Sequence, residues 1–71
     1  MYKIYTQSNC VFCIKAKHLL SKKGLKYQEI DINEDPNDKL VLKQLNLKTV
    51  PQIWRDDVHI GGYKELLLNL K

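Results

Sequence analysis

The chain has 71 residues, a formal net charge of +4 and a hydrophobic fraction of 44%. This length fits a single domain over residues 1–71 and excludes a two-domain enzyme with a cofactor-binding half of its own. The hydrophobic fraction is that of a globular domain rather than of a disordered chain. Apolar runs such as 66–68 are far too short to span a membrane, and the N-terminal segment lacks the apolar core of a signal peptide. We therefore expect a small soluble domain in the cytoplasm that acts as a monomer.

The positive charge comes almost entirely from lysines. Arg55 is the single arginine, and therefore the one side chain able to make a bidentate contact with a phosphate or a base. Five lysines lie between Lys15 and Lys26, where they form a solvated helix surface or attract an anionic thiol substrate. Nucleic acid is not an expected partner.

The first half of the chain predicts a strand, a helix and a second strand. Residues 2–6 combine β-branched and aromatic side chains, which favour a strand. The helix-start residues 8–9 precede a helix over 10–23, which begins at residue 10 or 11 and ends at Gly24. The alternating segment 26–32 predicts the second strand.

The second half predicts a helix, a hairpin and a last helix. Asp35-Pro36 is typical of an N-cap and a first helical position, and it predicts a helix over 36–46. The remaining elements are strands over 52–55 and 58–60 around a turn at 56–57, then a helix over 63–70 after Gly61-Gly62. The order β-α-β-α-β-β-α predicts an α/β fold with a parallel strand pair and an antiparallel hairpin.

The two cysteines, Cys10 and Cys13, stand at the start of the first predicted helix. Residues three apart on a helix lie on neighbouring turns, so this pair can close a disulfide without a backbone movement. At about 100° per residue, Cys10 lies outside the apolar arc of the helix and Cys13 lies on its margin. We therefore expect an exposed Cys10 and a partly buried Cys13, with Ile14 packed on a neighbouring element. The arc that faces the core is formed by Phe12, Ala16, Leu19 and Leu20.

This position gives the two thiols different chemistry. A helix N-terminus offers free N–H groups and a positive dipole end, both of which favour a thiolate at Cys10. Lys15 and Lys17 add positive potential nearby. Because the thiolate is the attacking species in disulfide exchange, Cys10 is the expected nucleophile and Cys13 the resolving thiol.

Other uses of two cysteines fit this sequence less well. A structural zinc site needs four ligands, and His18 and His59 are too far apart for finger spacing. A c-type haem site needs a histidine directly after the second cysteine, where Ile14 stands. An inert buried pair is the remaining alternative, and no general-base role is expected for His59.

The sequence resembles the glutaredoxin family within the thioredoxin-like fold. The resemblance implies a four-stranded mixed sheet flanked by three helices, with a cis Val50–Pro51 peptide beside the dithiol. The motifs that carry it are Tyr5-Thr6, Asn9-Cys10-Val11-Phe12-Cys13, Ala16-Lys17, Leu19-Leu20, Lys23-Gly24, Thr49-Val50-Pro51-Gln52-Ile53 and His59-Ile60-Gly61-Gly62-Tyr63.

The resemblance also implies a glutathione-dependent thiol–disulfide oxidoreductase, with glutathione as co-substrate and no metal. Its partners would be protein disulfides or glutathionylated proteins, ribonucleotide reductase among them. The backbone of Val50 would pair with the cysteinyl backbone of the substrate. The glycines before the last helix would offer free N–H groups to a carboxylate. The implied glutathione groove is lined by Cys10, Phe12, Thr49, Val50, Pro51, Gly62, Tyr63, Lys64 and Glu65.

Three departures from the family pattern affect this groove. Val11-Phe12 stands where the family usually has Pro-Tyr, and Gln7 stands where a lysine is usual. Lys64 replaces a common aspartate, which leaves Glu65 as the nearby acid for the ammonium group of glutathione. Glutathione is therefore expected to bind, with an affinity that these changes weaken.

Two alternative functions remain, and Gln7 and Lys64 favour the first of them. One is a thioredoxin-like redoxin that a flavin reductase recharges and that donates electrons to ribonucleotide reductase. The other is a glutaredoxin that holds an iron–sulfur cluster between two subunits through Cys10 and glutathione.

Overall fold

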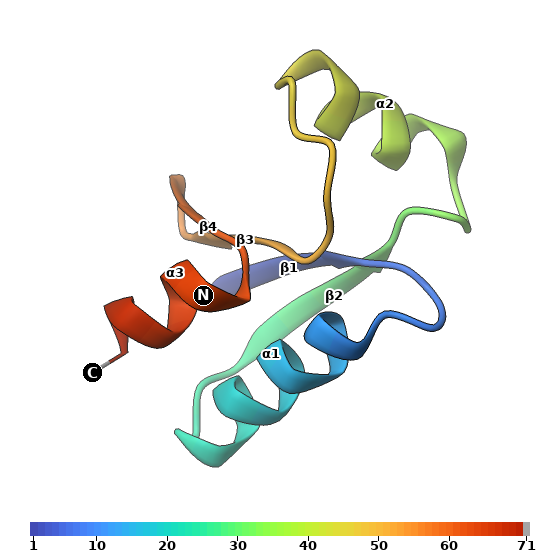
Figure 1. Ribbon diagram of the computed structural model, residues 1–71. Helices are drawn as coiled ribbons and strands as arrows, with labels where there is room; N and C mark the ends of the chain where they lie inside the picture. Colours follow the sequence, from blue (N-terminus) through green and yellow to red (C-terminus); the bar gives the residue numbers. More distant parts are fainter. Residues whose placement is uncertain (71) are drawn as a thin grey trace.

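The computed structural model describes residues 1–70 and contains the predicted elements in the predicted order (Figure 1). Element ends differ from the predictions by one or two residues. No helix within residues 1–70 is both long and apolar enough to cross a membrane. The elements are β1 (Tyr2–Thr6), α1 (Val11–Lys22), β2 (Tyr27–Asp31), α2 (Pro36–Gln44), β3 (Gln52–Arg55), β4 (Val58–Gly61) and α3 (Tyr63–Asn69).

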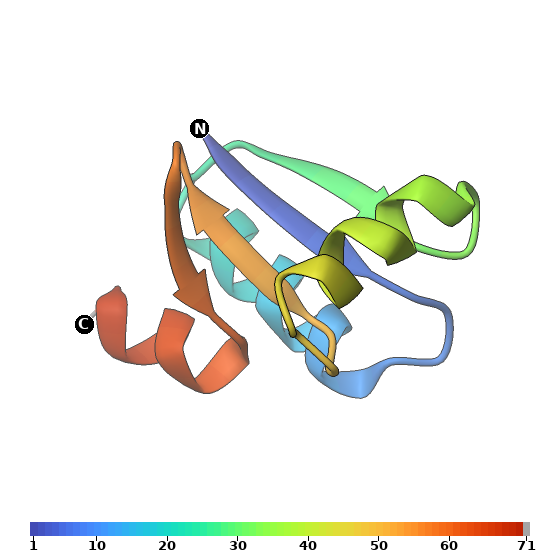
Figure 2. The same ribbon diagram turned by 90° about the horizontal axis from the view of Figure 1, so that it is seen from above.

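The four strands form one mixed sheet in the order β2-β1-β3-β4. β1 pairs with β2 in parallel and with β3 antiparallel, and β3 and β4 form the antiparallel hairpin. Helices α1 and α3 lie on one side of the sheet and α2 lies on the other (Figures 1 and 2). This arrangement confirms the predicted four-stranded mixed sheet flanked by three helices.

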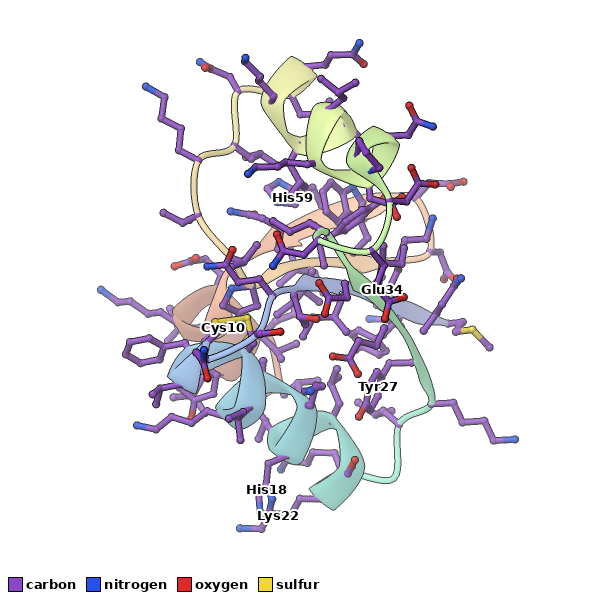
Figure 3. The ribbon with its side chains drawn as sticks, turned by 90° about the vertical axis from the view of Figure 1, so that its right-hand side faces the viewer. Cys10, His18, Lys22, Tyr27, Glu34 and His59 are labelled. Carbon is purple, nitrogen blue, oxygen red and sulfur yellow. A yellow bond between two sulfur atoms is a disulfide. The ribbon has the colours of Figure 1, made fainter. Side chains whose placement is uncertain are left out.

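Local sequence signals explain where the helices begin and end. Cys10 is the N-cap of α1, in an extended conformation (Figure 3). Asp35 caps α2 by accepting a hydrogen bond of 2.9 Å from the amide of Asn37. Gly24 follows α1 with a φ of 69°, a conformation that glycine adopts without steric cost.

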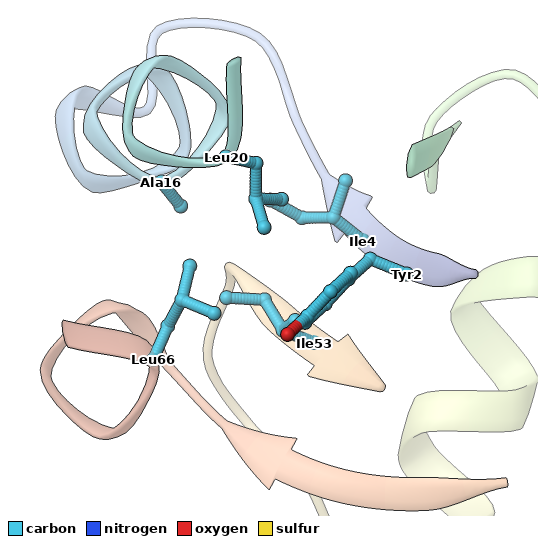
Figure 4. Packing of buried hydrophobic residues seen from close by; sticks show 6 residues of the cluster. All are labelled: Tyr2, Ile4, Ala16, Leu20, Ile53 and Leu66. Carbon is cyan, nitrogen blue, oxygen red and sulfur yellow. The ribbon is translucent and has the colours of Figure 1, made fainter. Parts of the chain in front are cut away.

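The main core lies between the sheet and the pair α1–α3. The side chains of Ile4 and Ile53 rise from the two central strands and meet Ala16, Leu20 and Leu66 from the helices (Figure 4). All five are fully buried, and they fix α1 and α3 on the same face of the sheet.

The buried stripe of α1 is narrower than the sequence predicts. It consists of Cys13, Ala16 and Leu20. Phe12 and Ile14 are 55% and 61% exposed, so the predictions that Phe12 faces the core and that Ile14 packs on a neighbouring element are wrong. Successive residues of a helix are rotated by about 100° around its axis. Because Cys13 points into the core, Phe12 and Ile14 on either side of it point away from the core.

A smaller apolar cluster lies on the opposite face of the sheet, under α2. It contains Tyr5, Ile32 and Leu42, and the ring of Trp54 packs edge-on against Tyr5 at 5.3 Å between centroids. Burial, and secondarily the charge of Asp38, raises the pKa of Tyr5. Leu42 is the buried residue of α2. The helix is therefore held to the sheet by few contacts.

A polar link joins the elements β1, β2 and α1. The carboxylate of Glu29 on β2 accepts hydrogen bonds of 2.9 Å from both the Thr6 hydroxyl and the Lys17 ammonium. The bond from Lys17 is the main reason that the pKa of Glu29 is lowered; burial opposes it, and the bond from Thr6 adds to it.

We predict that Glu29→Gln lowers the free energy of unfolding at pH 7 by no more than about 1 kcal/mol, because both partners are partly exposed. A lowered folded-state pKa adds stability above the unfolded value of about 4.3, and this stability is lost as the pH falls through the folded value. The difference between the wild type and Glu29→Gln should therefore shrink below about pH 4.3 in urea titrations. The exposed Glu34→Gln is the control, and a pH-independent difference would contradict the prediction.

Candidate active site

Cys10 and Cys13 form a disulfide at the N-terminus of α1, as the sequence predicts. Their Cα atoms are 5.2 Å apart, within the range of natural disulfides. The backbone N–H of Cys13 points at Sγ of Cys10 over 3.1 Å. Cys10 thus lies where a free amide in the first turn of the helix can stabilise negative charge on its sulfur.

The two sulfurs differ in exposure. Cys13 is 1% exposed, whereas Cys10 is half-buried. The predicted order of exposure is correct, but both side chains are more buried than the exposed Cys10 and partly buried Cys13 of the prediction. Cys13 lies on the buried stripe of α1, and Sγ of Cys10 is covered by the carbonyl oxygen of Val50 at 3.8 Å.

The lysines of α1 contribute unequally to the field at this site. Lys17 is bound to Glu29, so its charge is offset. Lys15 places its ammonium 5.3 Å from the ring centroid of Phe12, in a cation–π contact beside the dithiol. Of these two lysines, it is therefore Lys15 that adds to the positive potential of the helix N-terminus.

The loop between α2 and β3 brings Thr49, Val50 and Pro51 to the dithiol. The Val50–Pro51 peptide is cis, which confirms the expectation from the resemblance. Thr49 is exposed, Val50 is half-buried and Pro51 is buried. Figure 3 shows Cys10 at the end of α1 that faces this loop.

A buried glutamine that the sequence analysis did not single out holds this loop. The side-chain amide of Gln52 donates to the Thr49 carbonyl at 2.9 Å and to its hydroxyl at 3.2 Å. The side-chain oxygen Oε1 of Gln52 accepts a hydrogen bond of 2.8 Å from Nε2 of His59. The His59 ring packs on Trp54 with 4.5 Å between the ring centroids. A polar residue within a predicted strand next to the buried Ile53 was the available signal.

The turn before α3 places Gly62 against the dithiol loop. A Cβ atom on Gly62 would lie 3.5 Å from the carbonyl oxygen of Pro51, an ordinary van der Waals distance, so this turn lies close against the loop. The amide of Gly62 donates to the carboxylate of Glu65 at 2.8 Å. The expected free N–H at this position is therefore occupied, and Glu65 is not a free acid for a ligand ammonium.

The other predicted groove residues lie along the same side of the molecule. The rings of Phe12 and Tyr63 are 5.9 Å apart between centroids, which connects α1 to α3. Lys64 is exposed in the first turn of α3. Contacts thus join Cys10 to Val50, Gln52 to Thr49, and Phe12 to Tyr63. None of the side-chain hydrogen bonds and ion pairs found within residues 1–70 involves Lys64.

A cavity of about 730 Å³, here called the α2 cavity, opens on the other side of Cys10. Gln7, Cys10 and Val50 line one end, and α2 with its following loop lines the other. No sequence pattern predicted this site, because the three lysines that line it, Lys39, Lys43 and Lys48, look like ordinary surface charges in the sequence.

Among residues 1–70, no group of three or more histidine, cysteine, aspartate or glutamate side chains is arranged to hold a metal ion. Cys10 and Cys13 are joined to each other. The chemistry that this arrangement can perform is the making and breaking of a disulfide.

Comparison with known proteins gives consistent relatives. Glutaredoxin 1 of Rickettsia felis is 44% identical over 62 residues, which cover 83% of this chain and 61% of that protein. The chain thus spans less than two thirds of the length of this relative. Glutaredoxin 3 of Escherichia coli is 44% identical over 66 residues, covering 90% of this chain and 78% of that one.

A solved structure agrees with the observed fold. The solution structure of glutaredoxin from Brucella melitensis superposes with a TM-score of 0.78 at 35% identity, covering 94% of this chain and 74% of that one. The sheet order and helix placement are those of the thioredoxin-like fold. The family model for glutaredoxin matches residues 3–60. Because the matched segment runs from β1 into β4 and includes both cysteines and the Val50–Pro51 loop, the chain belongs to the glutaredoxin family.

Proposed function

We propose that the protein is a glutathione-dependent thiol–disulfide oxidoreductase. The observation that carries the proposal is the disulfide between a half-buried Cys10 and a buried Cys13 at a helix N-terminus. A substrate can reach the first sulfur and not the second, which supports Cys10 as the exchanging thiol and Cys13 as the resolving thiol. The substrate would be a protein disulfide or a glutathionylated protein, and ribonucleotide reductase is one such recipient.

In the first step, the Cys10 thiolate of the reduced protein attacks one sulfur of the substrate disulfide. A bond forms between Sγ of Cys10 and that sulfur, and the second substrate sulfur leaves as a thiolate that takes up a proton. The amide of Cys13, 3.1 Å from Sγ of Cys10, supports the negative charge before attack.

In the second step, the mixed disulfide on Cys10 is resolved. The Cys13 thiolate attacks Sγ of Cys10, the substrate leaves as a thiol, and the Cys10–Cys13 disulfide forms. Two glutathione molecules then restore the dithiol. The first binds Cys10 covalently and releases Cys13, and the second attacks the glutathione sulfur, so that Cys10 is released with glutathione disulfide as product.

Glutathione as reductant is supported by family membership, because glutaredoxins use glutathione. We propose that its cysteinyl backbone pairs with Val50, next to Cys10, as an added strand. Its γ-glutamyl end would lie towards Gly62 and Tyr63 and its glycyl end towards Gln7.

A second reductant, a flavin reductase, is favoured by the charge pattern. Gln7 supplies no cation, Lys64 repels an ammonium group, and the Glu65 carboxylate is already bound to Gly62. Coupled NADPH assays, one with glutathione and glutathione reductase and one with a flavin reductase of the thioredoxin type, distinguish the two.

We predict that Cys10→Ser abolishes all exchange, because the remaining thiol, that of Cys13, is buried. Cys13→Ser should keep glutathione-dependent deglutathionylation, which needs one thiol, and lose the reduction of protein disulfides, which needs resolution. Both variants are measured in the glutathione-coupled assay with a small mixed disulfide and with a protein disulfide. If Cys13→Ser were as inactive as Cys10→Ser on the mixed disulfide, the assigned roles would be wrong.

We also infer that Gln52 is a positioning residue. It touches neither sulfur, but it fixes the carbonyl and hydroxyl of Thr49, directly before the backbone of Val50 that the substrate would pair with. Because Gln52 is only 6% exposed, its two donated bonds are partly shielded from water.

Gln52→Met, which keeps the volume and removes the hydrogen bonds, should lower kcat/KM about tenfold, since about 1.4 kcal/mol is a typical cost for one or two neutral bonds. The loss should appear mainly in KM, because the loop binds substrate and does not react. His59→Phe, which keeps the ring contact with Trp54, should have a smaller effect, and Gln28→Met on the exposed side of β2 should have none. A fall in kcat at constant KM would refute this role.

A further inference from the structure

The α2 cavity is placed to receive the part of a substrate that adjoins its reactive sulfur. Cys10 and Val50 line it, so a chain that is disulfide-bonded to Cys10 and paired with Val50 continues directly into it. At about 730 Å³ it can hold more than a single small residue. Its location, on the α2 side of Cys10, is separate from the Phe12–Tyr63 contact on the other side.

The floor of the cavity is apolar. Ile32 at the end of β2 and Leu42 of α2 form it together with Leu47 of the following loop. These side chains belong to the small cluster under α2, and α2 itself is held to the sheet through Leu42. Ile32 and Leu42 are themselves buried and Leu47 is half-buried, so an apolar side chain of a ligand would extend this cluster and cover the surface that remains open at Leu47.

The charged side chains that line the cavity are all cationic. Lys39 and Lys43 lie one turn apart on α2, and Lys48 lies in the loop before Thr49. No aspartate or glutamate lines the cavity, and neither ion pair found within residues 1–70 involves these lysines. Three unneutralised cations around an apolar floor complement a ligand that is both acidic and apolar.

Glutathione satisfies only part of this description. Its residue after the cysteine is glycine, which brings a carboxylate to the lysines but no side chain to the floor. A polypeptide with a large apolar residue beside its cysteine and acidic residues beyond would use both features of the cavity.

We propose that the α2 cavity binds an acidic segment of protein disulfide substrates with a large apolar side chain next to the reactive cysteine, and thereby selects these substrates. This inference rests on the proposed function, because it assigns the substrate class of the same dithiol. The lysines supply the charge preference and accelerate encounter, and the floor supplies the preference for an apolar neighbour.

The test uses single-turnover exchange of the reduced protein with cysteine peptides that carry thionitrobenzoate as a mixed disulfide. Cys10 attacks the peptide sulfur, and the coloured thionitrobenzoate leaves as a thiolate, so no glutathione is needed. Three peptides are compared: one with leucine and two glutamates beside the cysteine, one with glycine in place of leucine, and one with lysines in place of the glutamates. Each is made with the segment before and after the cysteine.

At low salt, the leucine–glutamate peptide should react at least about tenfold faster than the lysine peptide. A factor of about ten is the smallest rate enhancement that electrostatic steering typically gives. It should also react faster than the glycine peptide. Lys39→Glu combined with Lys43→Glu should remove the preference for the acidic peptide. The matched control, Lys22→Glu with Lys26→Glu, changes the net charge equally at exposed positions away from the cavity and should retain it.

Equal rates for all three peptides would overturn the proposal while leaving the exchange activity intact. A preference for acid with no preference for leucine would also overturn it, because glutathione would then satisfy the site as well as a protein does. Retention of the acidic preference in the Lys39/Lys43 variant would show that the charge acts elsewhere. Failure to release thionitrobenzoate from any peptide would instead contradict the proposed oxidoreductase function.

Discussion

The antiparallel pairing of β1 with β3 is the constraint on which the site depends. In this register Tyr5, near the end of β1, lies opposite Gln52, at the start of β3. The chain that leaves β1 towards Cys10 and the chain that enters β3 from Val50 therefore meet at the same end of the sheet. The 3.8 Å approach of the Val50 carbonyl to Sγ of Cys10 follows from this pairing.

The same sheet divides two kinds of packing. The face under α1 and α3 holds a fully buried core, whereas the face under α2 buries little and leaves the α2 cavity beside Cys10. The dithiol thus stands on a rigid helix, and the surface that would recognise a substrate stands on the less tightly packed helix. Rigid placement of the sulfur and a looser recognition surface are both compatible with the proposed disulfide exchange.

The order of the elements and the dithiol were predictable because caps, strand alternation and the cysteine spacing are local signals. The orientation of α1 was not predictable in the same way. Its buried face consists of only Cys13, Ala16 and Leu20, whereas the apolar arc in the sequence is wider and includes Phe12. The pairing of Gln52 with His59, and of Gly62 with Glu65, depends on how the hairpin and the last helix meet the dithiol loop. The α2 cavity depends on tertiary packing alone, so its lysines looked like ordinary surface charges in the sequence.

The Glu65 side chain competes with any ligand carboxylate for the amide of Gly62, because it already accepts a hydrogen bond from that amide. The carboxylate is attached three residues from the amide that it occupies, so its local concentration is fixed by the chain and independent of any solute. A ligand carboxylate that reaches this amide must exchange with Glu65 rather than fill an open position. The affinity for a ligand at this end of the site therefore depends on the difference in free energy between two hydrogen bonds that the Gly62 amide can donate, one to the ligand carboxylate and one to Glu65. Releasing Glu65 costs free energy that the ligand's own contacts must offset.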